Sequence, residues 1–317
     1  MMKNKTEYSS NHPQPDQRNA SLRLKGIALM TCAIAAFTLS VLTLRASSAS
    51  AGAWLATSVR FGIGLLIVTP IYLPKGYLRP AQLIRNPDLI MRGVLGGIGV
   101  YLFYTTVPYL GAGVATFIST TYVVMAPLMA WAWLGERFTL AQGILTTMAM
   151  VGMFFMSGMG GVSPPPLLYV GLGFTGAVLA AMVVVYIRKL TRTEHGSTIY
   201  AAQCFFGLLI CAGPGVIQFS SAAPSASDLT GLIISGIAAS VGQLLMTFSY
   251  KYLTVSEGSL IMLCAPVIIM VGGIGLFGES ITLPQGVGAG LILTASMCMV
   301  RRRPAPIASE LAEPVTG

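Results

Sequence analysis

Long apolar runs separated by short polar connections dominate the sequence. A helix needs about 20 apolar residues to cross a ~30 Å hydrocarbon layer, because each residue rises ~1.5 Å. Irregular backbone is excluded from lipid, since its polar groups would stay unpaired. The pattern therefore predicts an all-α integral membrane protein of ten transmembrane helices. The ten runs are residues 26–44, 54–73, 93–110, 113–134, 138–156, 167–187, 199–219, 229–250, 259–276 and 283–300.

The positions of Lys and Arg predict how these helices are oriented. Of the 19 basic residues, all except Arg45 and Arg60 fall on one side of the membrane if both termini share that side. Basic residues favour the cytoplasmic side. We therefore predict a multi-pass protein of the bacterial inner (cytoplasmic) membrane with both termini in the cytoplasm.

The connections between the runs are too short to hold a soluble domain. Residues 1–25 are polar and rich in Asn, Ser, Gln and Pro, so we expect a disordered cytoplasmic N-terminus. Residues 157–166 are expected to form an outer linker, and residues 301–317 a cytoplasmic tail. Any function is therefore expected to reside among the helices.

A shift of 143 residues lays the second half of the chain on the first. The string Gly-Glu-x-x-Thr-Leu-x-Gln-Gly begins at Gly135 and again at Gly278. We predict two repeats of five helices each, residues 26–156 and 167–300. Because five is odd, the second copy enters the membrane from the opposite side. The repeats are therefore inverted, an arrangement that suits alternating access.

The end of each repeat resembles the EamA-like members of the drug/metabolite transporter (DMT) superfamily, in which a proline precedes about a dozen apolar residues and then Gly-Glu. The second repeat follows this pattern from Pro266 to Glu279. In the first repeat Pro127 lies one helical turn closer to Glu136, and Val123 occupies the expected proline position. Whether the two repeats bend at equivalent places is therefore left open.

Arg60-Phe61, in the second run, also resembles an Arg-Phe pair that is common there in the family. The resemblance covers nearly all of residues 26–300. It implies a secondary-active transporter that works by alternating access, usually an exporter of amino acids or related polar metabolites. The alternatives are an importer of a vitamin or nucleoside-like metabolite, of the riboflavin or S-adenosylmethionine type, or, in a different class, a membrane-embedded enzyme or assembly subunit.

Composition and motifs argue against other classes of protein. The chain is 54% hydrophobic and 9% charged, whereas soluble domains have about 25% charged residues. The net charge of +9 does not indicate nucleic acid, because the basic residues sit in short clusters between apolar runs. No Walker, dinucleotide-loop, HExxH or Ser/His/Asp pattern occurs. We therefore expect no catalytic residue, metal or cofactor. The expected partners are a small-molecule substrate, membrane lipid and a proton as candidate coupling ion, in a monomer or homodimer.

Polar and aromatic residues inside the runs are the candidates for a substrate site. Arg60 is the one basic residue well inside an apolar run, where a cation costs at least ~2.5–3.5 kcal/mol. It either contacts a substrate carboxylate or phosphate or anchors helix-end carbonyls. Trp131 is a further aromatic candidate, which either lines a cavity or packs between helices. The predicted substrate-binding residues are Arg60, Tyr104, Thr120, Tyr122, Gln203, Gln243 and Tyr250.

Three glutamates and two prolines are candidates for moving parts. Glu136 and Glu279 come just before a helix start, where a carboxylate suits the positive end of the helix dipole, and Glu257 precedes the ninth run. Each is interpreted either as a helix-start residue or as a gate or proton carrier. Pro127 and Pro266 predict helix bends, because proline removes a backbone donor. No acidic residue falls in the middle of a run, which argues against proton exchange for cationic drugs at a central carboxylate.

Overall fold

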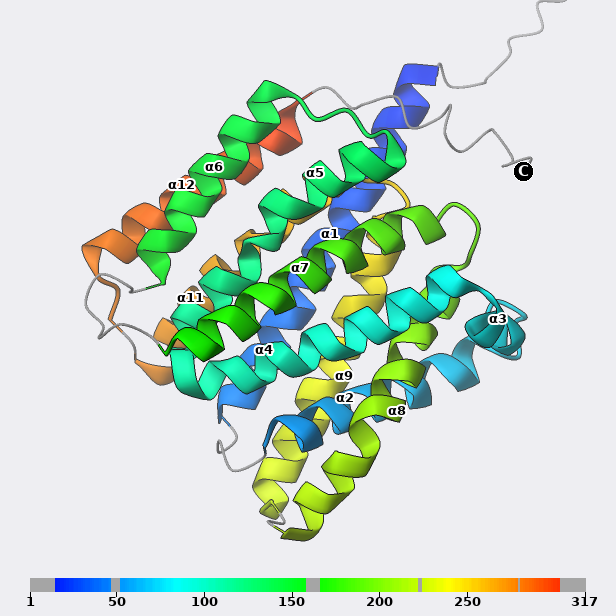
Figure 1. The fold of residues 1–317 in the computed structure, drawn as a ribbon. Coiled ribbons are helices and arrows are strands. Elements are labelled where there is room, and N and C mark those ends of the chain that lie inside the picture. Colours follow the sequence, from blue (N-terminus) through cyan, green and yellow to red (C-terminus); the bar gives the residue numbers. More distant parts are fainter. Residues whose placement is uncertain (1–14, 47–51, 158–165, 222–223, 279, 303–317) are drawn as a thin grey trace, which may run out of the picture.

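A computed structural model describes residues 15–46, 52–157, 166–221, 224–278 and 280–302, and its regular structure is helical throughout these ranges (Figure 1). The helices are α1 (Pro15–Ala46), α2 (Ala53–Tyr72), α3 (Pro80–Arg85), α4 (Pro87–Thr120), α5 (Tyr122–Leu134), α6 (Leu140–Met156), α7 (Leu167–Leu190), α8 (Gly196–Ser221), α9 (Ala226–Ser249), α10 (Val255–Met262), α11 (Cys264–Phe277) and α12 (Leu283–Arg301).

These helices supply the membrane spans that the apolar runs predict. Nine segments of the described chain are long and apolar enough to cross a membrane, and α6 is a shorter apolar helix. One span runs from Pro87 to Leu110 within α4, a second from Gly113 to Leu134 through α5, and α10 and α11 together form another. With α6 the total is ten. The predicted fold class is confirmed.

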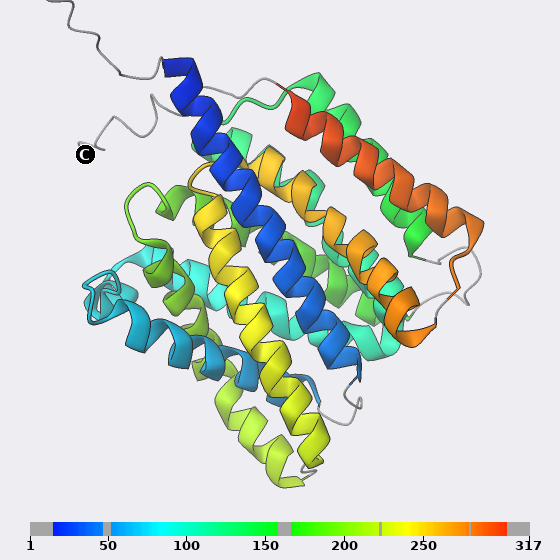
Figure 2. The same ribbon diagram turned by 180° about the vertical axis from the view of Figure 1, so that it is seen from behind.

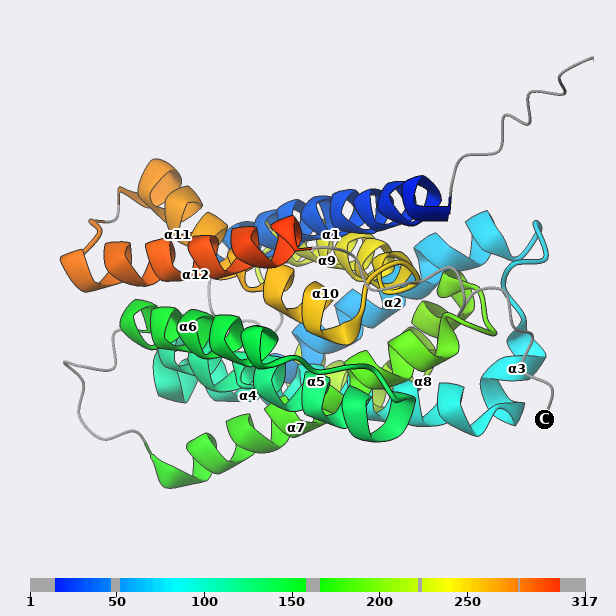
Figure 3. The same ribbon diagram turned by 90° about the horizontal axis from the view of Figure 1, so that it is seen from above.

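Helix packing obeys the symmetry expected of two inverted repeats. α1 packs on α9 and α4 packs on α7, while α2 pairs with α8 and α6 pairs with α12. Exchanging the first five spans for the second five converts the α1–α9 pair into the α7–α4 pair. The same exchange leaves the other two pairs unchanged. Figure 2 shows α1 alongside α9, and Figure 3 shows α6 beside α12 at one side of the bundle.

Glycines permit the closest approaches between helices. A Cβ atom on Gly152 of α6 would lie 2.6 Å from the carbonyl oxygen of Gly288 in α12, so these helices touch backbone to backbone. On the other side of the bundle, a Cβ on Gly93 would lie 2.6 Å from the carbonyl oxygen of Ala202 in α8. Such contacts allow helices to pack tightly in lipid, where small residues favour association.

The fourth and ninth spans are both broken, at equivalent places. The break between α4 and α5 is at Thr121, and the break between α10 and α11 is at Leu263. At each break the backbone N–H bonds three residues back, to Ile118 and Leu260 respectively, both at 3.2 Å. The break in the first repeat thus precedes Pro127 by more than one turn. There the Thr121 hydroxyl donates to the Ile118 carbonyl at 2.7 Å, a local bond that competes with regular helix.

The two largest departures from the predicted boundaries are at helix starts. α1 begins at Pro15, so residues 15–25 are helical instead of disordered. α4 begins at Pro87, six residues before the predicted run, because Asn86 caps the helix through the Asp88 N–H and Pro87 occupies its first turn. Residues 1–14, most of the outer linker and tail, and Glu279 lie outside the described residues.

Candidate functional site

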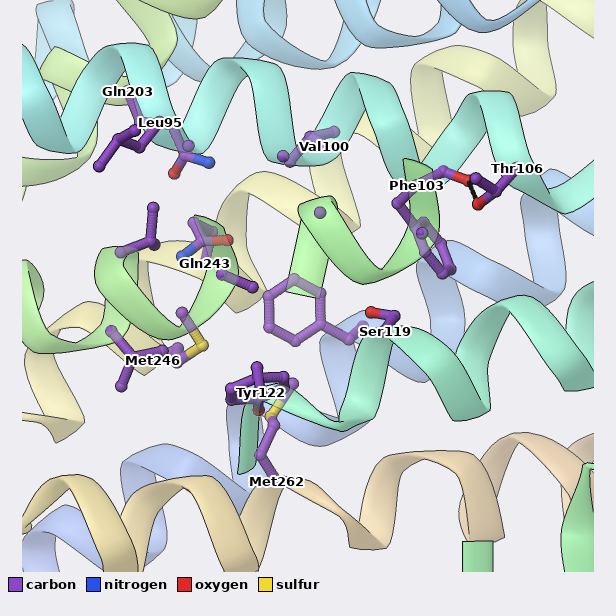
Figure 4. A pocket seen from close by; sticks show the side chains of 18 of the residues that line it. Leu95, Val100, Phe103, Thr106, Ser119, Tyr122, Gln203, Gln243, Met246 and Met262 are labelled. Atoms are coloured by element: carbon purple, nitrogen blue, oxygen red, sulfur yellow. Dashed lines mark hydrogen bonds between the residues drawn. The ribbon is translucent and has the colours of Figure 1, made fainter. Parts of the chain in front are cut away.

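A cavity of about 220 Å³ lies between the two repeats. Four helices of the first repeat (α1, α2, α4 and α5) and four of the second (α7, α8, α9 and α10) contribute to its walls. The residues labelled in Figure 4 are Leu95, Val100, Phe103, Thr106, Ser119, Tyr122, Gln203, Gln243, Met246 and Met262. Of the 20 lining residues 14 are apolar or glycine, so the walls are mainly apolar with a few polar groups.

The polar groups are unevenly distributed around the cavity. Figure 4 shows the amide side chains of Gln203 and Gln243 near each other at one end, and Phe103 and Thr106 toward the other. Arg60 is the one charged residue among the described residues that line the cavity. A mostly apolar pocket with a few convergent polar groups is the usual form of a small-molecule site.

Four of the seven predicted substrate-binding residues line this cavity: Arg60, Tyr122, Gln203 and Gln243. They come from α2, α5, α8 and α9, so the fold brings together residues that are far apart in the sequence. Tyr104 is not part of the wall, but its hydroxyl accepts a hydrogen bond of 3.4 Å from Arg60 Nη1.

The other predicted lining residues lie elsewhere. Thr120 is buried and its hydroxyl donates to the Phe117 carbonyl at 2.8 Å. Adjacent helical residues point in different directions, and its neighbours Ser119 and Tyr122 reach the cavity instead. Tyr250 is completely buried just after α9, with its hydroxyl 3.3 Å from Ser259 Oγ. Trp131 is 61% exposed on the outside of the bundle.

Sequence reasoning missed Arg92, which it placed in a basic connection. The residue lies in α4 with 0% of its surface exposed, and its Nη2 donates to Gln203 Oε1 at 2.8 Å. The Asn-Pro pair at positions 86 and 87 was the available signal, because an N-cap residue followed by proline marks a helix start. Reading that signal would have placed Arg92 inside the helix.

Glu136 forms a buried ion pair at one end of the bundle. We call this end the terminal face, because α1 begins and α12 ends there (Figure 1). Glu136 Oε1 accepts a hydrogen bond from Arg188 Nε at 2.8 Å, and its Oε2 accepts one from the Val255 N–H at 2.9 Å. Glu136 therefore caps α10 of the other repeat. The start of α6 is capped separately by a capping box of Thr139 and Gln142.

Glu257 forms a second buried ion pair at the same face. Its Oε1 accepts from Arg23 Nε at 2.8 Å, and it completes a capping box with Thr254 at the start of α10. Arg23 also donates to the carbonyls of Met299 and Val300, at 3.0 and 2.9 Å, at the end of α12. We refer to Arg23–Glu257 and Arg188–Glu136 as the terminal ion pairs. Each pair joins one repeat to the other.

The short helix α10 connects the terminal ion pairs to the cavity. Its first turn contains Glu257 and donates the Val255 N–H to Glu136. At its other end Met262 lines the cavity. Residues 255–261 are all buried. α10 and the two ion pairs therefore fill the space between the cavity and the terminal face.

His195 lies in the connection between α7 and α8, outside the spans. Its ring stacks on Tyr77 with 4.6 Å between centroids, and its Nδ1 lies 2.7 Å from Ser197 Oγ. Partial burial and the nearby charge of Lys251 lower the pKa of His195 below 6.5. Across the described chain, no three His, Cys, Asp or Glu side chains come together as they would to hold a metal ion.

Comparison with known proteins gives consistent results. A transporter of Archaeoglobus fulgidus without an assigned function is 26% identical over 63% of this chain, a match that spans 65% of that protein's own length. The threonine/homoserine exporter RhtA of Escherichia coli K12 is 27% identical over 76% of this chain and 79% of its own. A chain of known crystal structure matches the fold with a TM-score of 0.73 and 18% identity, over 86% of this chain and 94% of that one.

The family profile is the most specific of these matches. The profile described as the EamA-like transporter family matches twice, at residues 24–158 and 167–301. Each match covers one five-span repeat, and together they cover most of the chain. The protein is therefore a multi-pass membrane transporter of the drug/metabolite superfamily, and it belongs to the EamA-like transporter family.

Proposed function

We propose that the protein is a secondary-active exporter of a small polar metabolite, an amino acid or close relative, and that it works by alternating access. The observation that carries the proposal is the position of the cavity. Both repeats line it, and α10 with the terminal ion pairs lies between it and the terminal face. Inverted repeats can exchange their arrangements and so open a central site to each side in turn.

The cavity supports a small substrate. Its volume of about 220 Å³ is below the roughly 300–1,000 Å³ of sites for drug-sized ligands. Its polar groups, from Arg60, Ser119, Tyr122, Gln203 and Gln243, suit a molecule with several hydrogen-bonding groups. The similarity to an exporter named for threonine and homoserine favours amino acids over other metabolites of this size.

In this proposal the terminal ion pairs are the gate on the cytoplasmic side of the inner membrane. The basic residues near that face support a cytoplasmic location by the positive-inside rule. Each pair must separate when the repeats move apart, because each joins the two repeats. A proton is the candidate coupling ion, since protonation of Glu136 or Glu257 would remove the attraction that holds a pair together.

Transport into vesicles tests the proposal and its direction. The purified protein is reconstituted into liposomes, and uptake of radiolabelled threonine and homoserine is followed under a proton gradient of either sign. We expect accumulation in vesicles whose lumen is more acidic than the outside, because an exporter would exchange its substrate for protons, and this accumulation should collapse with a protonophore. Accumulation in vesicles whose lumen is more alkaline would instead support an importer.

A measurement on cells covers substrates other than threonine and homoserine. Amino acids in the medium are profiled for cells with and without the gene, with and without overexpression. The proposal fails if no amino acid or related metabolite changes in the medium and the vesicles take up none of them.

A further inference from the structure

Arg92 is a buried cation whose hydrogen-bonding groups are only partly used. Its Nη2 bonds to Gln203, but its Nε and Nη1 have no acceptor in the described part of the protein. A buried charge is costly unless it is paired and hydrogen-bonded. Such an arrangement is expected where a ligand brings a compensating negative charge.

Neither cation near the cavity has a carboxylate partner among the described residues. The described acidic side chains are otherwise placed. Glu136 and Glu257 belong to the terminal ion pairs, and Asp88 lies 2.7 Å from Lys189 in an exposed pair. Asp228 binds Ser225 at the start of α9, and Glu194 lies in the connection between α7 and α8. The region around Arg60 and Arg92 is therefore net positive.

The Arg92 guanidinium contacts two residues of the cavity wall, Gly96 and Gln203. Gly96 and Gln203 both line the cavity, and a Cβ atom on Gly96 would collide with Nη1 of Arg92. Glycine at position 96 thus leaves room for the guanidinium directly behind the wall. Since Gln203 Oε1 accepts from Arg92, the Gln203 amide has its N–H donors left for a group in the cavity.

We propose that Arg92, Gln203 and Gly96 form an oxyanion subsite in the cavity wall, which takes the carboxylate of the transported molecule. This inference rests on the proposed function and specifies its substrate class. The Gln203 amide donates to the carboxylate, and Arg92 attracts it across Gly96 through a medium of low dielectric, where Coulomb attraction is strong. Arg60 supplies a second positive charge. The cavity accordingly accepts carboxylic acids and zwitterionic amino acids and rejects amines that lack a carboxylate.

Thermal unfolding of the purified full-length protein in detergent tests the subsite. The probes are acetate, L-homoserine, 3-aminopropan-1-ol (homoserine without its carboxylate) and inorganic phosphate, each compared with chloride at equal ionic strength. We expect saturable stabilisation by acetate and homoserine and none by the amino alcohol. Stabilisation by phosphate alone would overturn the carboxylate assignment, and equal effects of all anions including chloride would overturn the subsite.

Substitutions then assign the effect to Arg92. Arg92→Gln and Arg92→Met should abolish stabilisation by carboxylates. Arg92→Met should also unfold at the same or a higher temperature without ligand, because it removes an uncompensated buried charge. A structural anchor would behave in the opposite way: the unfolding temperature would fall and the carboxylate effect would persist.

A pair of glycine variants keeps Arg92 itself unchanged. Gly96→Ala displaces the guanidinium and crowds the Gln203 amide, so it should weaken carboxylate binding by roughly tenfold or more, the value of the charge-assisted hydrogen bond from Gln203. Gly171→Ala is the control, because Gly171 of α7 is not part of the cavity wall and an added Cβ would meet no described atom within 4 Å. Equal losses in both variants would contradict the proposed subsite.

The outcomes separate the subsite from the proposed function. Carboxylate binding that depends on Arg92, without amino-acid transport in vesicles, would keep the subsite and overturn the exporter. Amino-acid transport that is unchanged in Arg92→Met would keep the exporter and overturn the subsite.

Discussion

Two pairs of arginines in this bundle have opposite surroundings. At the terminal face, Arg23 and Arg188 each lie 2.8 Å from a buried carboxylate and also donate to backbone carbonyls. Beside the cavity, Arg60 reaches only a tyrosine hydroxyl and Arg92 only an amide, among the described residues. The difference teaches that burial alone does not reveal the role of a charge. The paired cations join the two repeats, whereas the cations without a carboxylate are the ones that we propose act on a ligand.

Removing one carboxylate of a terminal ion pair should have the largest effect on stability. Glu136→Gln leaves Arg188 buried without a negative charge, and it weakens the cap on Val255. We expect a loss of about 3–5 kcal/mol in the free energy of unfolding, measured by denaturant titration in detergent. Asp88→Asn, in the exposed pair with Lys189, should cost about 0–1 kcal/mol. Similar losses in the two variants would show that burial does not set the strength of these pairs.

Removing both partners of the Arg188–Glu136 pair should cost less stability than removing Glu136 alone. In Glu136→Leu with Arg188→Met no unpaired charge remains, and apolar side chains fill the volume. Such replacements are often neutral or stabilising, although here the bonds to Val255 and Tyr250 are lost as well. We expect the double variant to be more stable than Glu136→Gln by about 1–3 kcal/mol. A double variant less stable than the single one would indicate that the backbone hydrogen bonds, and not the charges, hold this face.

Removing the cation from the cavity wall should reduce transport without loss of fold. Arg60→Gln removes a half-buried cation that has no carboxylate partner in the described residues, so its unfolding free energy should change by less than about 1 kcal/mol. Uptake into vesicles should fall by about tenfold, because the substrate carboxylate loses one of its charges. Arg60→Lys, which keeps the charge, should recover part of the uptake. Reduced yield of folded protein together with normal specific uptake would instead make Arg60 a structural anchor.

The smallest effect is a pH dependence at the terminal face. The pKa of His195 is below its usual 6.5 in the folded protein, because the ring is partly buried and near Lys251. As the pH falls through about 6.5, the unfolded chain takes up the proton first, so stability should decrease slightly toward pH 5. His195→Gln should remove this component of the pH dependence of thermal unfolding. An identical profile in the variant would exclude His195 as the cause.

The sequence was sufficient for the fold because lipid imposes strict rules on it. Run length predicted the spans, and the repeated Gly-Glu string predicted the duplication that the family profile also matches. The same rules explain where prediction stopped. Hydropathy cannot show that Arg92 is buried, because a cation at the end of an apolar run has the same appearance whether it faces water or protein. Only its contact with Gln203, 111 residues away, decides this.

The candidate site was only partly predictable for a related reason. Membership of an apolar run identified Gln203 and Gln243, since amides inside lipid need a cavity or a partner. It could not separate Thr120 from its neighbours Ser119 and Tyr122, because the break at Thr121 changes which residues face inward. It likewise could not reveal that Glu136 caps a helix of the opposite repeat, since the pairing depends on how the two copies pack.

The contact between Gly152 and Gly288 limits the kinds of motion that the bundle permits. α6 and α12 touch there through their backbones, and neither contributes to the cavity wall. Exchanging the two repeats maps the α6–α12 helix pair onto itself. Since neither helix lines the cavity, the cavity can change its shape while the contact between α6 and α12 stays closed.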